Sequence, residues 1–533
     1  MPVRLPQRRL MLPSSLALAV APLLAGGCQA IDAPPALAPP PADGAILHWP
    51  VPEPAPLSPA APVLWVALAS RLGPPPDSAA GDAAPPLRLR SAGSRPLALI
   101  AADGRRVSAA ELVLHWRWQT LPQPQLLRRQ VLGPFASFES AERVAALWRR
   151  QGVAATIAHP REWEVWAAAG TPPPDGMTAR PLERRETRRA VLELQRPTGA
   201  LTLQGPLRIE APDGLRWREG VFAGPFRLQS DAHGGWSLIE QVPLERYLEG
   251  VLPHEIGAGA PAAALEAQAV LARTWAMRNS HRFAVDGYHL CSDTQCQVYA
   301  DPRLAGAAVR QAIGRSRGKV LSWNGEPIHA VYHASNGGIA AGFDEVWNAS
   351  PLPYLKPFVD APEPVARRLP LPVQVGPLAT LLKQNSTTYG ADHPLYRWQR
   401  LLTAADVAQA LSRSQQGVGE VQRLEVVARG PSGRVLTLRI RGSKGTRLLS
   451  RDAIRRTLRQ VPSTLFLLEA AGPGRWRLVG GGFGHGAGLS QAGAVDLARR
   501  GWTTQRILSH YYPQTELRGT GELKSSGIPG EAP

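Results

Sequence analysis

Glu255 is a carboxylate whose setting in the sequence would suit a general acid. It lies in the turn His254-Glu-Ile-Gly-Ala-Gly259, between two segments with helical patterns. A carboxyl group held between buried helices can be desolvated and can stay protonated, as a general acid must. From these residues alone, however, a solvated loop carboxylate is the favoured interpretation.

Two amphipathic segments must position this turn. The segment before it, Val242–Leu252, has apolar residues at helical spacing, which predicts one buried stripe: Leu244, Tyr247, Leu248, Val251 and Leu252. Pro243 suits the first helical position and Pro253 discourages continuation of the helix. After the turn, Pro261 begins an alanine-rich run that predicts a second helix through Ala276.

Length and charge set the outer bounds. The 533 residues are enough for two or three domains with a sizeable core. The formal net charge is +18 and comes almost wholly from arginine, which favours anionic polymers such as cell-wall glycan. The arginines form neither a dense run nor an aromatic-basic platform, so nucleic acid is not an expected partner.

The first 28 residues have the layout of a secretory signal. Arg4, Arg8 and Arg9 precede the apolar stretch Leu16–Leu24, which is short for a membrane span, and small residues lead to Cys28. This end resembles a bacterial lipobox, which favours lipidation at Cys28 over simple cleavage; an uncleaved anchor is the third alternative. The mature protein is therefore expected outside the cytoplasm, in the periplasm or cell envelope.

Composition divides the rest of the chain. Residues 29–96 are rich in proline and alanine, which predicts that most of this segment is an extended tether; within it, Val63–Leu72 suits either a strand or a short helix. A small folded domain is expected at 97–170, followed by a second linker at 171–188. Residues 189–517 carry strand patterns on both sides of helical ones, which predicts an α+β domain, and 518–533 is predicted to be a disordered tail.

Within the small domain, the pattern from Val131 to Ala168 predicts a strand, a helix and two further strands. Ser137 suits the N-cap of the helix and Gly152 its end. This βαββ unit, with Gly-Pro-Phe-Ala before the helix, resembles the SPOR domain, which binds peptidoglycan glycan strands stripped of peptides. A generic small α/β domain is an equal alternative.

Four motifs in the large domain carry a second resemblance. They are the Glu255 stretch, the segment from Tyr288 to Tyr299, Ala-Val-Tyr-His-Ala-Ser-Asn-Gly-Gly ending at Gly338, and the glycine-rich run from Gly480 to Ala494. In order and content they resemble the stage II sporulation protein D / amidase-enhancer family. The resemblance extends over about residues 191–517, and four motifs in register are far more specific than any one of them.

The resemblance implies a lytic transglycosylase that cleaves peptidoglycan between N-acetylmuramic acid and N-acetylglucosamine, with a preference for peptide-stripped strands. Such an enzyme needs one acid/base and forms a 1,6-anhydro product, in contrast to the two carboxylates of ordinary glycosidases. Glu255 matches the family's catalytic glutamate, and Arg273 matches a basic residue thought to assist. The alternative is a non-catalytic wall-binding protein that stimulates an amidase.

Two details bear on this assignment. Glu245 and Glu249 lie off the apolar stripe and are expected to be solvated, so no second catalytic carboxylate is apparent. Gly257 stands where the family usually has proline, which is expected to loosen the turn around Glu255.

The third and fourth motifs supply candidate substrate contacts. The glycine-rich run does not match a phosphate-binding loop, and its glycines allow close approach to a sugar. Ser490 also suits the N-cap of the next helix, and structural roles in tight turns are the alternative for the others. The candidates are His333, Ser335, Asn336, His485, Ser490 and Gln491.

His289, Cys291 and Cys296 allow two interpretations. Outside the cytoplasm, two nearby cysteines favour a disulfide. Some relatives hold zinc in this region with one histidine and two cysteines, so a structural zinc site is the second interpretation. No cofactor is required for catalysis under either. The expected partners are peptidoglycan glycan strands, a cell-wall amidase and, through the N-terminal anchor, the membrane.

Overall fold

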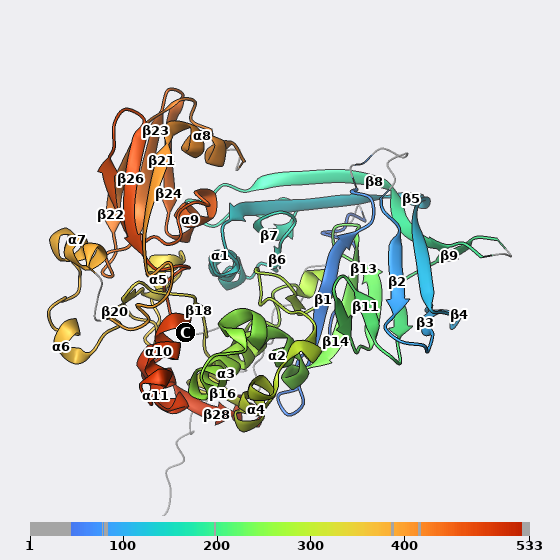
Figure 1. Cartoon of the computed structure of the whole chain (residues 1–533). Coiled ribbons are helices and arrows are strands. Elements are labelled where there is room, and N and C mark those ends of the chain that lie inside the picture. The colour runs from blue at the N-terminus through green and yellow to red at the C-terminus, as the bar shows by residue number, and fades with distance from the viewer. Residues whose placement is uncertain are drawn as a thin grey trace, which may run out of the picture. The chain divides into compact units, whose positions relative to one another are not determined.

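The computed structural model of the chain describes residues 44–76, 78, 84–196, 199–384, 388–413 and 417–524. Helices and mainly antiparallel sheets are mixed along the chain (Figure 1), with 24% of residues helical and 36% in strands, which confirms the α+β class. The expected signal segment and Cys28 lie outside the described residues. Of the helices in the described ranges, none combines the length and apolar character needed to cross a membrane.

A seven-stranded sheet supports the first helix of the site. Its strand β14 pairs antiparallel with β1 and continues directly into that helix. Of the two alternatives left open for Val63–Leu72, the structure has the strand, β1, whereas the tether predicted for the rest of 29–96 is wrong at β2, because Leu87 and Leu89 are buried there despite the proline-rich flanks. The sheet order is β15 (Leu290–Cys291), β1 (Val63–Leu72), β14 (Trp236–Pro243), β13 (Phe226–Ser230), β10 (Leu207–Glu210), β3 (Leu97–Ile100) and β4 (Arg106–Ala109).

A second large sheet contains the long antiparallel ribbon of β5 and β8 (Figure 1). The linker predicted for 171–188 is wrong from Arg180 onward, because β8 begins there and pairs with β5. The strand order of this second sheet is β12 (Gly220–Phe222), β11 (Leu215–Trp217), β2 (Leu87–Ser91), β5 (Glu111–Phe135), β7 (Trp163–Ala168) and β6 (Thr156–Ala158). In addition, β8 (Arg180–Leu194) pairs with both β5 and β9 (Leu201–Leu203).

The segment 97–170 is divided between these two sheets. Strands β3 and β4 belong to the first, whereas β5, β6 and β7 belong to the second and carry helix α1 (Phe138–Arg150). The predicted N-cap is confirmed, since the Ser137 hydroxyl accepts a hydrogen bond from the Ser140 N–H at 3.3 Å. The segment therefore does not form a sheet of its own, and its resemblance to a SPOR domain stays a prediction.

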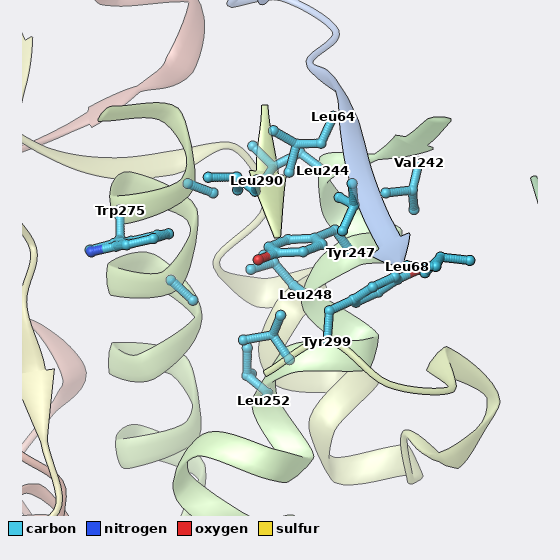
Figure 2. Close-up of a cluster of buried hydrophobic side chains, with 14 of the residues drawn as sticks. Leu64, Leu68, Val242, Leu244, Tyr247, Leu248, Leu252, Trp275, Leu290 and Tyr299 are labelled. Atoms are coloured by element: carbon cyan, nitrogen blue, oxygen red, sulfur yellow. The ribbon is translucent and has the colours of Figure 1, made fainter. Parts of the chain in front are cut away.

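The predicted helices on either side of Glu255 are α2 (Leu244–Leu252) and α3 (Ala262–Arg278). The predicted apolar stripe of α2 is buried throughout. In Figure 2, Tyr247 and Leu248 of α2 lie between Leu64 and Leu68 of β1 on one side and Trp275 of α3 on the other. One continuous core thus fixes α2 and α3 against the seven-stranded sheet.

Short elements after α3 complete this core. The predicted tail is wrong at residues 518–524, because β28 pairs with β16 and a 3₁₀ turn follows; residues 525–533 lie outside the described part. The elements are η2 (Ala284–Asp286), η3 (Pro302–Leu304), α4 (Ala307–Arg315), β16 (Lys319–Trp323), β17 (Glu326–Pro327), β18 (Tyr332–His333), β19 (Ile339–Ala340), α5 (Phe343–Val346), β20 (Phe358–Val359), α6 (Glu363–Ala366), α7 (Val375–Lys383), β27 (Leu489–Ser490), α10 (Gln491–Arg499), α11 (Thr504–Tyr511), β28 (Glu516–Gly519) and η4 (Thr520–Glu522).

A separate apolar cluster lies under the strands of residues 397–481. Leu424, Leu438 and Phe466 are buried in it, and β22 and β23 confirm the strand patterns predicted after the helical ones of the large domain. This part supplies α9 to the site. Its elements are β21 (Arg397–Thr403), α8 (Ala404–Arg413), β22 (Val421–Arg429), β23 (Val435–Gly442), β24 (Gly445–Ser450), α9 (Asp452–Thr457), β25 (Phe466–Ala470) and β26 (Arg475–Gly481).

Candidate active site

Glu255 lies in a single π-helical turn, η1 (Pro253–Gly257), between α2 and α3. Pro253 ends the α-helical hydrogen bonding of α2, but the chain continues as a helical turn. Gly257 closes the turn with a φ of +84°, a left-handed conformation that proline, fixed near −65°, cannot adopt. The glycine therefore sets a defined backbone path here, in contrast to the loosening predicted for it.

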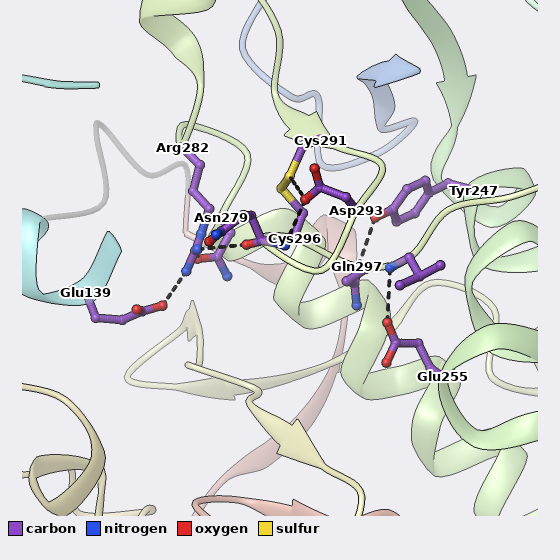
Figure 3. Close-up of a disulfide and its surroundings, with 11 residues drawn as sticks. Glu139, Tyr247, Glu255, Asn279, Arg282, Cys291, Asp293, Cys296 and Gln297 are labelled. Carbon is purple, nitrogen blue, oxygen red and sulfur yellow. Dashed lines mark hydrogen bonds and ion pairs between the residues drawn. A yellow bond between two sulfur atoms is a disulfide. The ribbon is translucent and has the colours of Figure 1, made fainter. Parts of the chain in front are cut away.

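A chain of hydrogen bonds reaches the Glu255 carboxyl group. The Val298 N–H donates to its Oε1 at 3.1 Å, and the Tyr332 hydroxyl donates to the same carboxyl group. The Gln297 amide donates to the Tyr332 Oη at 2.9 Å, and the Tyr247 hydroxyl donates to the Gln297 Oε1 at 3.1 Å (Figure 3). Burial raises the pKa of Glu255, and the donors from Val298 and Tyr332 lower it only in part.

Glu255 lines a pocket with a volume of about 260 Å³. Aromatic side chains form much of its wall and come from segments far apart in the sequence. They offer flat apolar faces, which suits a sugar ring better than a small ion. The aromatic wall consists of Phe138, Trp163, Trp275, Tyr332 and Trp347, and the charged and imidazole groups are Glu139, Glu255, Arg282, Asp452, Arg455, Arg456 and His485.

The three carboxylates of the pocket differ in their partners. Burial acts to raise the pKa of Glu139, but its ion pair with Arg282 holds that pKa below the usual value. Burial opposes ionisation of Asp452 as well, yet two neighbouring guanidinium groups hold its pKa at about 2. No arginine acts on the pKa of Glu255. Of the three, Glu255 alone has a raised pKa and can therefore donate a proton at a pH where the other two are ionised.

His485 lies in the pocket and supports Tyr332 rather than contacting Glu255. Its Nε2 is 2.8 Å from the Tyr332 carbonyl oxygen, and its Nδ1 accepts from the Ala487 N–H at 3.2 Å. Burial lowers the pKa of His485 to about 4, so the ring is neutral at neutral pH and Nε2 carries the proton that is donated. His485 lines the pocket and fixes the strand that carries Tyr332, while the substrate contact predicted for it stays a prediction.

The structure does not bring the other predicted sugar contacts into this pocket. His333 is buried against His485 and its Nδ1 bonds the Ala487 carbonyl at 3.1 Å. Ser335 pairs through its backbone with Phe483. Asn336 is fully buried and its Nδ2 donates to Asp360 at 2.7 Å. These three side chains hold the turns that form one wall, which is the structural alternative.

Ser490 and Gln491 also have structural partners. The Ser490 Oγ accepts from the Gly493 N–H at 3.2 Å and caps α10, as predicted. The Gln491 Nε2 is 3.4 Å from the Oε1 of Gln268, which is fully buried on α3. Both residues therefore join α10 to its surroundings and neither lines this pocket, so the sugar-contacting role predicted for them stays a prediction.

Arg273 does not lie at the pocket, so the assisting catalytic role expected of it is not supported by its position. Its side chain is fully buried, and Nε and Nη2 each donate to the Glu245 carboxylate at 2.8 Å. Its Nη1 donates to the Lys319 carbonyl at 2.9 Å. Glu245, expected to be solvated, is this arginine's partner. The pair joins α2, α3 and β16 behind the site.

Cys291 and Cys296 form a disulfide, the first of the two predicted interpretations (Figure 3). A zinc ion does not fit these residues, because the thiolates are consumed by the S–S bond. His289 has no free nitrogen either: Nδ1 accepts from the Trp65 N–H at 2.9 Å and Nε2 bonds the Ala55 carbonyl at 3.0 Å. The disulfide closes the loop directly before Gln297 and Val298; Val298 donates to Glu255, and Gln297 donates to Tyr332.

Several residues that line the pocket or support Glu255 are not marked by the sequence. Tyr332 and Gln297 stand next to candidates that were chosen, His333 and Cys296, but no periodic pattern marks a single hydroxyl or amide as a site residue. Arg455 and Arg456 lie on a short helix outside all four motifs. Their assembly depends on tertiary pairing of distant segments, for which a single sequence holds no direct signal.

Comparisons with known proteins match most of the large domain. A family profile described as "Stage II sporulation protein" matches residues 232–323, which include Glu255 and the disulfide loop. A profile described as "Domain of unknown function (DUF8618)" matches residues 341–488, which include Arg456 and His485.

Three curated relatives show the extent of the similarity. The amidase enhancer of Bacillus subtilis (strain 168) is 28% identical over 298 residues, which cover 51% of this chain and 40% of that protein. Stage II sporulation protein D of the same strain is 30% identical over 295 residues, covering 52% and 75%. Its counterpart from Bacillus amyloliquefaciens is 29% identical over 295 residues, also covering 52% and 75%. The chain thus matches under half the length of the first relative and three quarters of the others.

Proposed function

The chain belongs to the stage II sporulation protein D family, and on this premise we propose that it is a lytic transglycosylase that cleaves the glycan backbone of peptidoglycan. Membership of the family gives the protein a cell-wall role. The observation that carries the finer proposal is the contrast among the pocket carboxylates. Glu255 has a raised pKa, whereas neighbouring arginines lower the pKa values of Glu139 and Asp452 and hold both carboxyl groups ionised.

The proposed reaction uses Glu255 twice. Its protonated carboxyl group gives its proton to the glycosidic oxygen as the bond to C1 of the muramic residue breaks, and the alcohol of the next sugar leaves. The resulting carboxylate then takes the proton of the C6 hydroxyl of that muramic residue. Its O6 attacks C1 and closes a 1,6-anhydro ring. One carboxylate suffices because the substrate supplies its own nucleophile, whereas retaining and inverting glycosidases need two.

Val298 and Tyr332 serve the second half of this cycle. Both donate hydrogen bonds to the carboxyl group, and such bonds favour its charged form. They therefore stabilise the carboxylate that remains after proton transfer, while burial favours the protonated form of the resting group. The balance between the two effects sets the pH range in which Glu255 can act.

The pH profile should report this balance. Because Glu255 must begin protonated, kcat/KM should fall as pH rises through its pKa. Tyr332→Phe removes one donor to the carboxylate, so the pKa should rise further and the alkaline limb should move up by about one pH unit. Tyr247→Phe, which alters only the far end of the hydrogen-bond chain, should move it less. If the alkaline limb of the kcat/KM profile stays in place or moves to lower pH in Tyr332→Phe, the assignment of Tyr332 as a donor to the Glu255 carboxylate is contradicted.

The products test the reaction itself. Purified peptidoglycan, intact and amidase-stripped, is digested with the full chain and the fragments are analysed by mass spectrometry. We expect 1,6-anhydro-muramic ends, with more product from the stripped strands. Reducing ends in their place would indicate hydrolysis and a second carboxylate. Full glycan binding without any cleavage would remove the enzymatic proposal.

A second candidate function is a non-catalytic enhancer of a cell-wall amidase. The observation that favours it is the match to a relative named amidase enhancer. Under this alternative, the Glu255→Gln chain should stimulate an N-acetylmuramoyl-L-alanine amidase as well as the unmodified chain does. Under the first proposal, any stimulation that arises from glycan cleavage is lost in that variant.

The location and anchoring belong to the same proposal. We propose that the protein acts in the cell envelope after export, with attachment to the membrane through Cys28. The SPOR-like segment contributes Phe138, Glu139 and Trp163 to the pocket, which supports a role for it in contacting glycan next to the cleavage site.

A further inference from the structure

The pocket that contains Glu255 holds more positive charge than its other carboxylates neutralise. Three guanidinium groups line it, from Arg282, Arg455 and Arg456. Two carboxylates pair with them: Glu139 with Arg282, and Asp452 with both of the others. One positive charge therefore remains while Glu255 is protonated, and it is available to an anionic ligand.

The donors of Arg282 are committed within the protein. Its Nε donates to the Asn279 Oδ1 at 2.9 Å, its Nη1 to the Gln295 carbonyl at 3.3 Å, and its Nη2 to Glu139 (Figure 3). With only 5% of its side chain exposed, this arginine ties α1 to the disulfide loop. It is not the source of the excess charge.

The two arginines of α9, Arg455 and Arg456, differ from Arg282 in having uncommitted donors. Arg455 uses Nε and Nη2 on Asp452, at 2.9 and 3.0 Å, and Arg456 uses only Nε, at 3.0 Å. Among the described residues, Nη1 of Arg455 and both Nη atoms of Arg456 have no hydrogen-bond partner. Their side chains are 26% and 39% exposed, so a ligand in the pocket can reach them. The buried Asp452 holds both guanidinium groups in place for such a ligand.

The arrangement keeps these charges apart from the acid. Neither Arg455 nor Arg456 is among the groups that shift the pKa of Glu255, although all three line one pocket. Glu255 can thus remain protonated while the arginines hold an anion elsewhere on the same substrate. The lining of the same pocket includes Trp347, which can pack against a sugar ring.

We propose that Arg456, together with Arg455, forms a subsite for the free lactyl carboxylate of a muramic residue and so selects strands without peptides. This inference rests on the proposed function, because it assumes a muramic sugar in the pocket. A lactyl carboxyl group that carries no peptide is an anion that a guanidinium group can bind with two hydrogen bonds. With a peptide attached, the same carboxyl group is an uncharged amide and lacks the second acceptor oxygen.

Binding measured without turnover tests the subsite. The full chain with Glu255→Gln is titrated with fluorescently labelled, amidase-stripped glycan, and the same glycan after chemical reduction of its lactyl carboxyl groups to alcohols. Stripped glycan should bind about tenfold more tightly than the reduced form. Adding Arg456→Gln should weaken binding of the stripped glycan by about the same factor and leave the reduced form unaffected. Arg456→Lys, which keeps the charge but not the fork, should lose less.

Arg459→Gln is the matched control, because Arg459 is exposed, lies three residues further along and does not line the pocket. It removes the same net charge and should leave both affinities unchanged. Equal losses in Arg456→Gln and Arg459→Gln would show a general charge effect and overturn the subsite, as would equal binding of stripped and reduced glycan. Selective carboxylate binding without cleavage by the unmodified chain would retain the subsite and refute the catalytic proposal.

Discussion

Replacing Glu255 by glutamine should lower the turnover of stripped peptidoglycan by about 10² to 10⁴-fold, the usual contribution of a general acid/base. The amide nearly matches the carboxyl group in shape and can still accept the hydrogen bond from the Val298 N–H. It cannot give a proton to the glycosidic oxygen or take one from the C6 hydroxyl. Glycan affinity should therefore change little while kcat collapses. Single-turnover product yields and equilibrium binding, measured on the same preparations, separate the two effects.

Glu249→Gln supplies the matched control for this variant. Glu249 lies on α2, six residues before Glu255, pairs with Arg246 at 3.3 Å and does not line the pocket. Its replacement should leave both turnover and binding near those of the unmodified chain. Turnover close to normal in Glu255→Gln would remove Glu255 from the reaction. Equal losses in the two variants would indicate a damaged fold around α2.

Replacing Asp360 by alanine should lower the free energy of unfolding by about 3 to 5 kcal/mol. The carboxylate of Asp360 is fully buried and accepts from the Asn336 amide at 2.7 Å and the Tyr511 hydroxyl at 2.9 Å, and its other oxygen bonds the His510 Nε2 at 2.8 Å. Alanine leaves all three donors without an acceptor in the interior. Urea unfolding followed by tryptophan fluorescence should show a much lower midpoint.

Asp392→Ala is the comparison for stability. The Asp392 side chain is 91% exposed and its nearest cation, on Arg499, is 3.8 Å away. An ion pair of this kind is screened by solvent, so the unfolding midpoint should not move. A similar midpoint in both variants would mean that the Asp360 network does not hold the third motif against α11. The candidate sugar contacts Ser335 and Asn336 would then need another structural explanation.

Local patterns predicted the elements around Glu255 well. The apolar stripe of α2 and the alanine-rich α3 follow from helical spacing, and Pro261 precedes α3 as expected. The sequence alone does not decide whether the Glu255 carboxyl group is solvated or desolvated. That depends on Val298 and Tyr332, which arrive from segments 43 and 77 residues further along the chain.

Errors arose where composition was used in place of pattern. The proline-rich composition of residues 29–96 predicts a tether, with Val63–Leu72 left open as a strand or a short helix, whereas Val63–Leu72 pairs along β14 and Leu87–Ser91 forms a further strand. Proline disfavours a strand only at positions where the ladder needs a backbone N–H, which proline lacks, and the prolines there flank the strands. Arg273 was assigned to the active site by resemblance, whereas pairing with Glu245 across 28 residues buries it behind the site.

The assembly of the pocket from distant segments makes its acidity a property of the folded chain alone. The raised pKa of Glu255 requires the disulfide loop, β18 and η1 to be in place together. An unfolded or proteolysed chain carries at position 255 an ordinary glutamate, ionised at neutral pH and unable to donate a proton. Under the proposed function, the general acid therefore forms only when folding is complete, and a cut that releases one wall of the pocket would remove it.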